Sequence, residues 1–227
     1  EYQIDELLEE EKKYNLRKKN LLRSGYPFFD LLKNNENKEF VERKILVAPS
    51  WNPDIPLLYE KYYSKILNDL QKNNFEIIFR PHPEYSKRYS KNYYEFKNKF
   101  ISNINIKFDT NETLQELLKS CETLITDWSG IAYEFAYLNN RGVIFNNVPL
   151  KNLNKSIISP EKIFEYKNRE KIGVINDTNE DILETFKKLK KLNQDDINSF
   201  FNSNFFNLGN SSEFISESIK ITLKNIR

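Results

Sequence analysis

Short apolar runs alternate with longer amphipathic segments through most of this sequence, and this alternation constrains the fold more than any other feature. The runs are Ile45–Ala48, Phe75–Phe79, Ile104–Phe108, Thr123–Thr126 and Val143–Phe145, with a weaker run at Ile172–Ile175. Strands that alternate with helices pair as a parallel sheet, which the helices cover on both faces. The pattern therefore predicts the α/β class, with a Rossmann-like parallel sheet flanked by helices.

The segments between these runs carry apolar residues near helical spacing, so they predict helices. The predicted helices are Leu57–Lys72, Lys87–Phe100, Thr113–Ser120, Ile131–Leu138, Asp181–Leu192 and Glu213–Ile226.

The amino-terminal part has a different composition. Glu1–Leu22 is charge-dense and lacks Gly and Pro, so it predicts a helix, and Ser24–Pro27 predicts the turn that ends it. Its charge runs are typical of a solvated helix face, and a membrane-surface or partner-binding face is the alternative. An apolar cluster at Phe28–Leu32 then precedes Lys33–Lys38, which has the composition of a linker.

We therefore divide the chain into residues 1–42, a charged helix and linker from a preceding domain, and residues 43–227, the Rossmann-like domain. The sequence contains no methionine, even at position 1. This absence predicts that the chain is part of a longer product.

Composition excludes several functions. The 35 Lys and Arg against 33 Asp and Glu leave a net charge of +2, whereas a dedicated nucleic-acid binder is expected to be more basic. With one cysteine, Cys121, and one histidine, His82, the chain can form neither a disulfide framework nor a Cys/His zinc site. No DxD pair is present, so we expect no metal cofactor. No apolar run approaches the roughly 20 residues of a membrane-spanning helix.

Nucleotide motifs of the common kinds are also missing. The five glycines are spread along the chain and none forms GxGxxG, and there is no GKS or GKT loop. NAD or FAD binding of the usual kind and a P-loop are therefore excluded.

Polar and aromatic residues follow three of the predicted strands. Pro49–Asn52, with Ser50 and Trp51, follows the first strand, Arg80–Glu84 follows the second, and Asp127–Gly130 follows the fourth and leads directly into a helix. Ligands of an open parallel sheet bind beyond the carboxyl ends of its strands. We therefore expect these three loops to form one site.

The turn Asp127–Gly130 begins a predicted helix. Free backbone N–H groups and the positive end of the helix dipole bind phosphate oxygens at such a position, and Ser129 and Gly130 would make these contacts. In the alternative interpretation, Asp127 or Ser129 only caps its own helix.

His82 lies between two prolines that restrict its backbone. Its imidazole is predicted to donate a hydrogen bond to a diphosphate or to protonate a leaving phosphate; alternatively, backbone groups of a tight loop satisfy it. Arg80 is predicted to bind phosphate through two parallel hydrogen bonds, and pairing with Glu84 is the alternative.

Glu134 lies one turn beyond Gly130 and is predicted to accept hydrogen bonds from ribose or polyol hydroxyls, unless it is an ordinary surface residue of the helix. Trp51 and Trp128 are predicted to stack on a base or to close the floor of the pocket, and plain packing is the alternative. Cys121 is expected to be a small core residue.

Taken in order, these motifs resemble those of the CDP-glycerol glycerophosphotransferase family, which includes teichoic-acid primases, polymerases and capsule-building enzymes. The motifs are Ser24-Gly25-Tyr26-Pro27 with Asp30, Ala48-Pro49-Ser50-Trp51, Arg80-Pro81-His82-Pro83, and Leu124–Gly130 with Glu134-Phe135-Ala136 and Val143–Phe145. The resemblance runs from Ser24 to Phe145, with a weaker match at Gly209–Ser212.

This resemblance implies a GT-B arrangement, in which two Rossmann-like domains enclose the active site, and this chain is similar to the carboxyl-terminal, nucleotide-binding half. It implies a donor such as CDP-glycerol, a polymer or lipid-linked acceptor, and a cytoplasmic location with peripheral contact to the plasma membrane. The family's catalytic His-Gly-Thr motif belongs to its amino-terminal half and is absent here, so the chain alone is expected to bind donor without turnover.

The resemblance also implies roles for particular residues. His82 would be catalytic. The implied donor-binding residues are Ser50, Trp51, Arg80, Asp127, Ser129, Gly130, Glu134, Ser211 and Ser212.

Trp128, Gly130 and Asn52 depart from the family pattern, which usually has tyrosine, serine and arginine at these positions. Two other functions stay open at this point. One is a GT-B glycosyltransferase, or a sugar epimerase of related fold, that uses a nucleotide-sugar. The other is a non-catalytic nucleotide-binding or scaffolding domain, which the departures at Asn52 and Gly130 favour.

Overall fold

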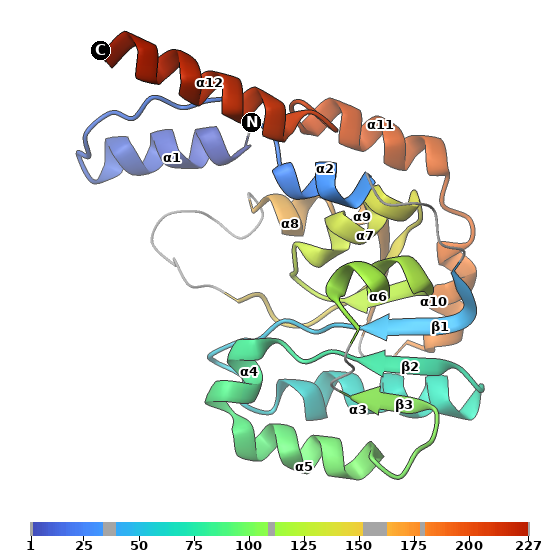
Figure 1. Cartoon of the computed structure of the whole chain (residues 1–227). Helices are drawn as coiled ribbons and strands as arrows, with labels where there is room; N and C mark the ends of the chain where they lie inside the picture. Colours follow the sequence, from blue (N-terminus) through green and yellow to red (C-terminus); the bar gives the residue numbers. More distant parts are fainter. Residues whose placement is uncertain (1, 34–39, 109–111, 152–162, 178–179, 227) are drawn as a thin grey trace.

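A six-stranded, fully parallel sheet forms the centre of the computed structural model, which describes residues 2–33, 40–108, 112–151, 163–177 and 180–226. The strand order is β3-β2-β1-β4-β5-β6 (Figure 1). The strands are β1 (Val41–Val47), β2 (Glu76–Phe79), β3 (Ile106–Phe108), β4 (Cys121–Thr126), β5 (Val143–Asn146) and β6 (Gly173–Asn176). The predicted α/β class, with a Rossmann-like parallel sheet, is confirmed.

Helices connect and cover these strands. They are α1 (Tyr2–Lys13), α2 (Pro27–Lys33), α3 (Leu58–Lys72), α4 (Pro83–Arg88), α5 (Ser90–Phe100), α6 (Leu114–Ser120), α7 (Ile131–Asn139), α8 (Phe164–Lys167), α9 (Arg169–Ile172), α10 (Ile182–Leu189), α11 (Gln194–Asn204) and α12 (Ser211–Ile226). The short helices α2, α8 and α9, together with α11, lie outside the predicted helical segments, and α4 overlaps the predicted helix Lys87–Phe100 only at its last two residues. None of the described helices is long and apolar enough to span a bilayer.

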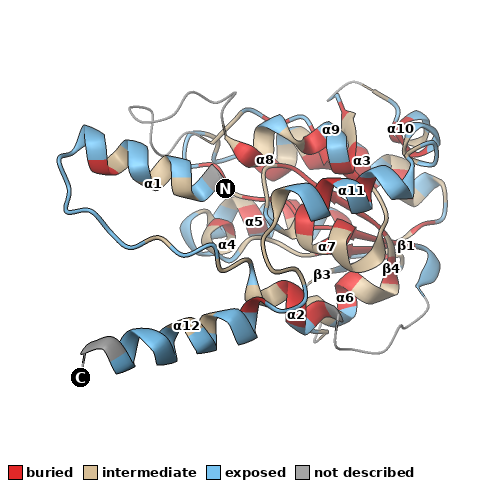
Figure 2. Ribbon diagram, turned by 90° about the horizontal axis from the view of Figure 1, so that it is seen from above, coloured by how far each residue is buried: buried red, intermediate tan, exposed pale blue. Residues whose placement is uncertain are grey.

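Alternating side chains of the strands build a core on each face of the sheet. In β1, Ile45 and Val47 face the layer that contains α3, α5 and α10, and Leu46 faces the layer that contains α2, α6, α7 and α11. All three side chains are fully buried, and each such burial stabilises the fold by roughly 2 kcal/mol. Figure 2 shows the buried residues gathered on the strands and inner helix faces, whereas α12 projects from this body and is largely exposed.

The carboxyl ends of the strands meet at one edge of the sheet, on the left in Figure 1. Val47 at the end of β1 pairs with Phe79 of β2 on one side and with Ile125 of β4 on the other. The strand order therefore reverses at β1, and the loops after β1, β2 and β4 begin side by side. A position of this kind is where open parallel sheets bind ligands.

The first helix is shorter than the sequence predicts. Helix α1 ends at Lys13, because Asn15 adopts a left-handed conformation with φ 48° and the Leu16 N–H bonds back to the Glu11 carbonyl at 2.9 Å. This pairing is a common way to close a helix. The prediction of one helix as far as Leu22 is therefore wrong beyond Lys13.

Helix α2 packs on the body that the sheet forms. Phe29 and Leu32 are buried in the core, and the ring of Phe29 stacks on Tyr137 of α7 with 4.2 Å between centroids. Residues 34–38 of the predicted linker lie outside the described residues. The division at residue 42 stays a prediction. Cys121 is buried, as expected of a core residue.

Candidate functional site

The buried carboxylate of Asp127 joins the loops that follow β1 and β4. It is 1 % exposed and accepts hydrogen bonds from the backbone N–H of Ser50 at 3.1 Å, from the Tyr63 hydroxyl at 2.8 Å and from the N–H of Trp128 at 2.6 Å. Burial raises the pKa of Asp127, and these hydrogen bonds oppose that shift. Ser50 is itself buried. The geometry therefore makes Asp127 and Ser50 organisers of the two loops, and direct contact with a ligand stays a prediction for both.

Helix α7 begins immediately after this carboxylate, and its first turn is open. Gly130 is the N-cap residue and no side chain caps this helix end. A Cβ placed on Gly130 would have no neighbour within 4 Å, so there is open space over the turn. Ser129, which is partly exposed, accepts the first helical hydrogen bond through its carbonyl, from Ala132 at 3.1 Å. Uncapped N–H groups at the positive end of a helix form a site for an anion.

The open turn faces a cavity of about 280 Å³, which we call the Glu134 cavity. The motif 24–26, the start of α7 and the segment before α12 contribute to its lining. The lining residues include Ser24, Gly25, Tyr26, Gly130, Tyr133, Glu134, Asn204, Phe205 and Phe206. The cavity thus joins polar groups with several aromatic rings.

Glu134 and Tyr26 form a hydrogen-bonded pair in this cavity. The Tyr26 hydroxyl donates to Oε1 of Glu134 at 2.9 Å. Burial raises the pKa of Glu134, and the bond from Tyr26 opposes that shift. Burial and the nearby carboxylate raise the pKa of Tyr26 to about 12. The alternative of an ordinary surface glutamate does not describe this position.

His82 begins helix α4 at the neighbouring strand end. Its Nδ1 accepts a hydrogen bond from the N–H of Glu84 at 3.1 Å, which leaves the proton of the neutral ring on Nε2. Burial, followed by the positive charge of Lys151, lowers the pKa of His82 below its ordinary value of 6.5. The ring is therefore a neutral hydrogen-bond donor at pH 7.

Two cations and His82 surround the ring of Trp51, and we call these four residues the Trp51 cluster. The ammonium of Lys151 lies 4.2 Å from the centre of the indole ring, the guanidinium of Arg88 lies 5.1 Å away, and the imidazole centroid lies 6.3 Å away. The Arg88 charge is paired, since its Nε donates to Glu84 at 2.7 Å. Contacts of this kind hold a cation over an aromatic face.

Arg80 has a partner within the protein. Its Nη1 donates to the backbone carbonyl of Glu112 at 3.3 Å, and it lines a separate hollow with Pro81 and Ser86. Glu84 pairs with Arg88 instead of Arg80. Arg80 and Gly130 line different hollows, and His82 and Trp51 are not among the residues that line the Glu134 cavity. The expected gathering of the three loops around one ligand, and phosphate binding by Arg80, therefore stay predictions.

The serines at the start of α12 already have an anionic partner within the chain. Asp30 accepts a hydrogen bond from the N–H of Ser212 at 2.7 Å, and the Ser211 hydroxyl donates to the carbonyl of Asn207 at 2.9 Å. Burial raises the pKa of Asp30, but hydrogen bonds from the Ser212, Ser211 and Gly209 groups outweigh it and lower the pKa overall. An internal carboxylate thus occupies this helix end, and donor binding by these serines stays a prediction without support from this geometry.

The Trp128 side chain packs against protein groups. Its ring stacks on Tyr166 with 4.7 Å between centroids, the guanidinium of Arg169 lies 4.0 Å from the ring centre, and its Nε1 donates to the Val148 carbonyl at 2.9 Å. These contacts hold the turn that leads into α7, so packing describes Trp128 better than stacking on a base.

Two residues of these features have no role that the sequence patterns predict. Tyr26 belongs to a motif that predicts only a turn, and no motif contains Lys151. Lys151 lies in the loop after β5, so applying the strand-end rule to the fifth strand would have found it. No group of three or more His, Cys, Asp or Glu in the described part of the chain could hold a metal ion, and the expectation of no metal cofactor stays a prediction.

Comparison with known proteins identifies relatives named for teichoic acid biosynthesis. A family model described as CDP-Glycerol:Poly(glycerophosphate) glycerophosphotransferase matches residues 7–220. The minor teichoic acid biosynthesis protein GgaB of Bacillus subtilis (strain 168) is 30 % identical over 152 residues, which cover 55 % of this chain and 15 % of that protein. The teichoic acid poly(glycerol phosphate) polymerase of Bacillus spizizenii is 28 % identical over 226 residues, which cover 89 % of this chain and 54 % of that protein. This chain thus spans about half the length of the second relative and less of the first.

A solved structure shares the fold. The UDP-GlcNAc 2-epimerase of Methanocaldococcus jannaschii, in complex with UDP-GlcNAc and UDP, superposes with a TM-score of 0.53 at 18 % identity. The match covers 87 % of this chain and 54 % of that chain. At this identity the likeness concerns the fold alone.

Proposed function

Because this chain belongs to the CDP-Glycerol:Poly(glycerophosphate) glycerophosphotransferase family, we propose that it binds the CDP-glycerol donor of a transferase that builds teichoic acid or a capsule polymer. The family predicted from the sequence motifs is thereby confirmed. The identity of the donor, the identity of the acceptor and the assignment of donor binding to this part of the full-length enzyme belong to the proposal.

One observation carries this proposal: the uncapped start of α7 opens into the cavity that contains Glu134. Phosphate oxygens of the donor would bind the N–H groups at Gly130. The Glu134 carboxylate would accept hydrogen bonds from ribose hydroxyls, and the rings of Tyr26 and Tyr133 offer apolar surface to the cytosine base. Such a site needs no GxGxxG motif, because the open helix end supplies the phosphate contacts.

The proposed reaction transfers glycerol phosphate. The acceptor hydroxyl attacks the phosphorus that bears glycerol, the bond from this phosphorus to the bridging oxygen breaks, and CMP leaves with the electron pair. The Nε2–H group of the neutral His82 ring would stabilise the charge on the leaving phosphate by donating a hydrogen bond. We propose that the base accepting the hydroxyl proton lies in a part of the enzyme outside this sequence, which has no His-Gly-Thr motif.

We further propose that the enzyme works at the cytoplasmic face of the plasma membrane, where a lipid-linked acceptor would be available. An exposed basic stretch supports this location. It consists of Lys12, Lys13, Arg17, Lys18, Lys19 and Arg23. Clusters of this kind bind anionic lipid headgroups with an affinity that salt weakens. Sedimentation with phosphatidylglycerol vesicles at low and high salt tests this, and salt-insensitive binding would contradict it.

Calorimetric titration of the 227-residue chain with CDP-glycerol, CDP, UDP and UDP-GlcNAc tests the proposed donor. We expect cytidine nucleotides to bind best, and we expect His82→Ala and Ser129→Ala to weaken CDP binding by about tenfold. A preference for UDP-GlcNAc would favour a nucleotide-sugar enzyme. Unchanged affinity in both variants would remove the proposed site, and the absence of any nucleotide-induced rise in melting temperature would favour a non-catalytic domain.

A further inference from the structure

We propose that Lys151 is an additional phosphate-binding residue, held on the face of Trp51 so that its ammonium group and the His82 imidazole contact the diphosphate of the same donor. This inference rests on the proposed function, since it concerns the donor of that site. It adds the loop after β5 to the loops after β1, β2 and β4.

The loop that carries Lys151 is fixed by two neighbouring loops. The Nδ2 of Asn52, from the loop after β1, donates to the Pro149 carbonyl at 3.2 Å. The Nε1 of Trp128, from the loop after β4, donates to the Val148 carbonyl at 2.9 Å. Asn52 is 3 % exposed and Val148 is buried. The backbone next to Lys151 is therefore anchored at the point where the strand order reverses.

The ammonium group of Lys151 lies 4.2 Å from the centre of the Trp51 ring. A cation over an indole face gains electrostatic attraction, and the stem of the side chain loses contact with water. The imidazole centroid of His82 lies 6.3 Å from the centre of the same indole ring. The charge is therefore positioned before a ligand arrives, which lowers the entropy cost of binding.

The two described carboxylates that act on this charge have other partners. Glu84 is paired with Arg88, and Asp127 is engaged by backbone and hydroxyl donors below the surface. Among the residues that the structure describes, no carboxylate forms an ion pair with Lys151. A half-buried cation in this situation favours an anionic ligand.

The pKa shifts agree with a shared electrostatic environment. The charge of Lys151 contributes to the lowered pKa of His82. Burial lowers the pKa of Lys151, while the charges of Asp127 and Glu84 oppose that shift. A bound diphosphate would lie within reach of both groups and would offset the cost of burying the ammonium.

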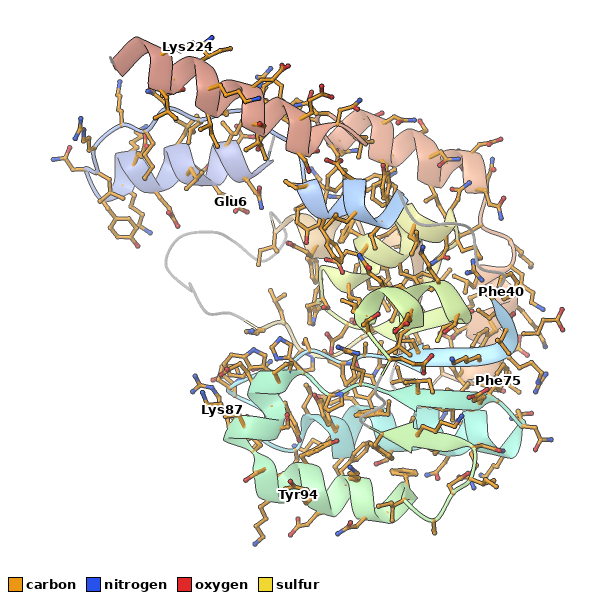
Figure 3. All side chains as sticks on the ribbon, in the orientation of Figure 1. Glu6, Phe40, Phe75, Lys87, Tyr94 and Lys224 are labelled. Atoms are coloured by element: carbon orange, nitrogen blue, oxygen red, sulfur yellow. The ribbon has the colours of Figure 1, made fainter. Side chains whose placement is uncertain are left out.

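Three variants test this role. Lys151→Met removes the charge but keeps an unbranched apolar stem, and Lys151→Arg keeps the charge. Lys87→Met is the matched control, because Lys87 is exposed on α4 and lies outside the Trp51 cluster (Figure 3). Each full chain is titrated by calorimetry with CDP, CMP and inorganic pyrophosphate, and its melting temperature is recorded.

We expect Lys151→Met to weaken CDP and pyrophosphate binding by about tenfold and CMP binding by less. Lys151→Arg is expected to retain most of the affinity, and Lys87→Met all of it. CDP binding by Lys151→Met at the affinity of the unmodified chain would overturn the inference. The inference would also be overturned if Lys151→Met lost equal affinity for CMP and CDP. A fall in its melting temperature large enough to explain the lost affinity by unfolding would overturn it too.

The same titrations distinguish a failure of the proposed function from a failure of the role of Lys151. If the unmodified chain binds pyrophosphate as tightly as CDP, nucleotide recognition fails, whatever the effect of Lys151. If CDP is preferred and Lys151→Met changes nothing, the proposed function survives and the role of Lys151 does not. Absence of binding by all three ligands would overturn both.

Discussion

The hydroxyl of Tyr26 donates a 2.9 Å hydrogen bond to the carboxylate of Glu134, although the two residues are 108 positions apart in the sequence. The bond connects the turn before α2 with the first turn of α7, and both residues line the Glu134 cavity. Burial raises the pKa of Glu134 and the Tyr26 hydroxyl opposes that shift. Tyr26 therefore restricts the orientation of the Glu134 carboxylate in the cavity.

Replacing Tyr26 by phenylalanine removes this hydrogen bond and keeps the ring. We expect Tyr26→Phe to weaken CDP binding about fivefold, which corresponds to ~1 kcal/mol, because Glu134 loses its positioning donor. Tyr94→Phe on α5 is the control, since Tyr94 is 59 % exposed and outside the cavity (Figure 3). Calorimetry measures both affinities. An equal loss in the two variants would contradict a specific role for Tyr26.

His82 makes the stability of the chain depend on pH. Its folded-state pKa is lowered from 6.5, first by burial and then by Lys151. Between the two pKa values the unfolded chain binds more protons than the folded chain, so stability falls as the pH drops through 6.5 toward the lowered pKa. We expect the melting temperature to decrease as the pH falls from 6.5 toward the lowered pKa.

The substitution His82→Asn isolates this contribution. Asparagine keeps a side-chain acceptor at the start of α4 but does not titrate, so the difference between the two melting curves reports His82 alone. Because the chain has one histidine, nuclear magnetic resonance of its imidazole also gives the pKa directly. A measured value at or above 6.5 would refute the prediction. In Lys151→Met the value is expected to rise.

Two glycines of the Glu134 cavity differ in what an added methyl group meets. Gly25 has φ +83°, and a Cβ there would overlap the carbonyl oxygen of Phe206 and the hydroxyl of Ser211. Gly130 has φ −57° and open space. We expect Gly25→Ala to destabilise the chain by ~2 kcal/mol or more and Gly130→Ala by less than ~0.5 kcal/mol. Urea unfolding measures both free energies, and equal losses of stability in the two variants would contradict this difference in space around the glycines.

Gly130→Ala is nevertheless expected to weaken CDP binding, because the methyl group enters the cavity.

Asp127 is predicted to stabilise the fold by holding together the loops that follow β1 and β4. In Asp127→Asn an amide N–H group would face the donors from Ser50, Tyr63 or Trp128, so we expect a loss of ~3 kcal/mol in the free energy of unfolding. Tyr63→Phe removes one of these donors and is expected to cost ~1 kcal/mol. Chemical denaturation gives both values. If Asp127→Asn unfolds at the same denaturant concentration as the unmodified chain, the carboxylate does not organise the loops.

Local patterns predicted the strands of the sheet and the edge at which the candidate loops meet. Each apolar run of the predicted strands contributes to one strand of the sheet, because residues that alternate between two covered faces must be apolar on both. The parallel order then places the loops after β1, β2 and β4 at one edge. The end of α1 could not be placed correctly, because the left-handed turn at Asn15 is a local choice that periodicity does not report.

The sequence by itself determined the class of fold and, through its motifs, the family, and it predicted three of the loops proposed for the site. Tertiary structure decided which polar groups of those loops already have a partner: Asp30 occupies the start of α12, Glu112 engages Arg80, and the start of α7 stays open. It also brought Tyr26 to Glu134 and Lys151 to Trp51. The physical reason is that strand and helix periodicity depends on neighbours in the chain, whereas each of these contacts joins residues from separate elements whose distance is set by packing alone.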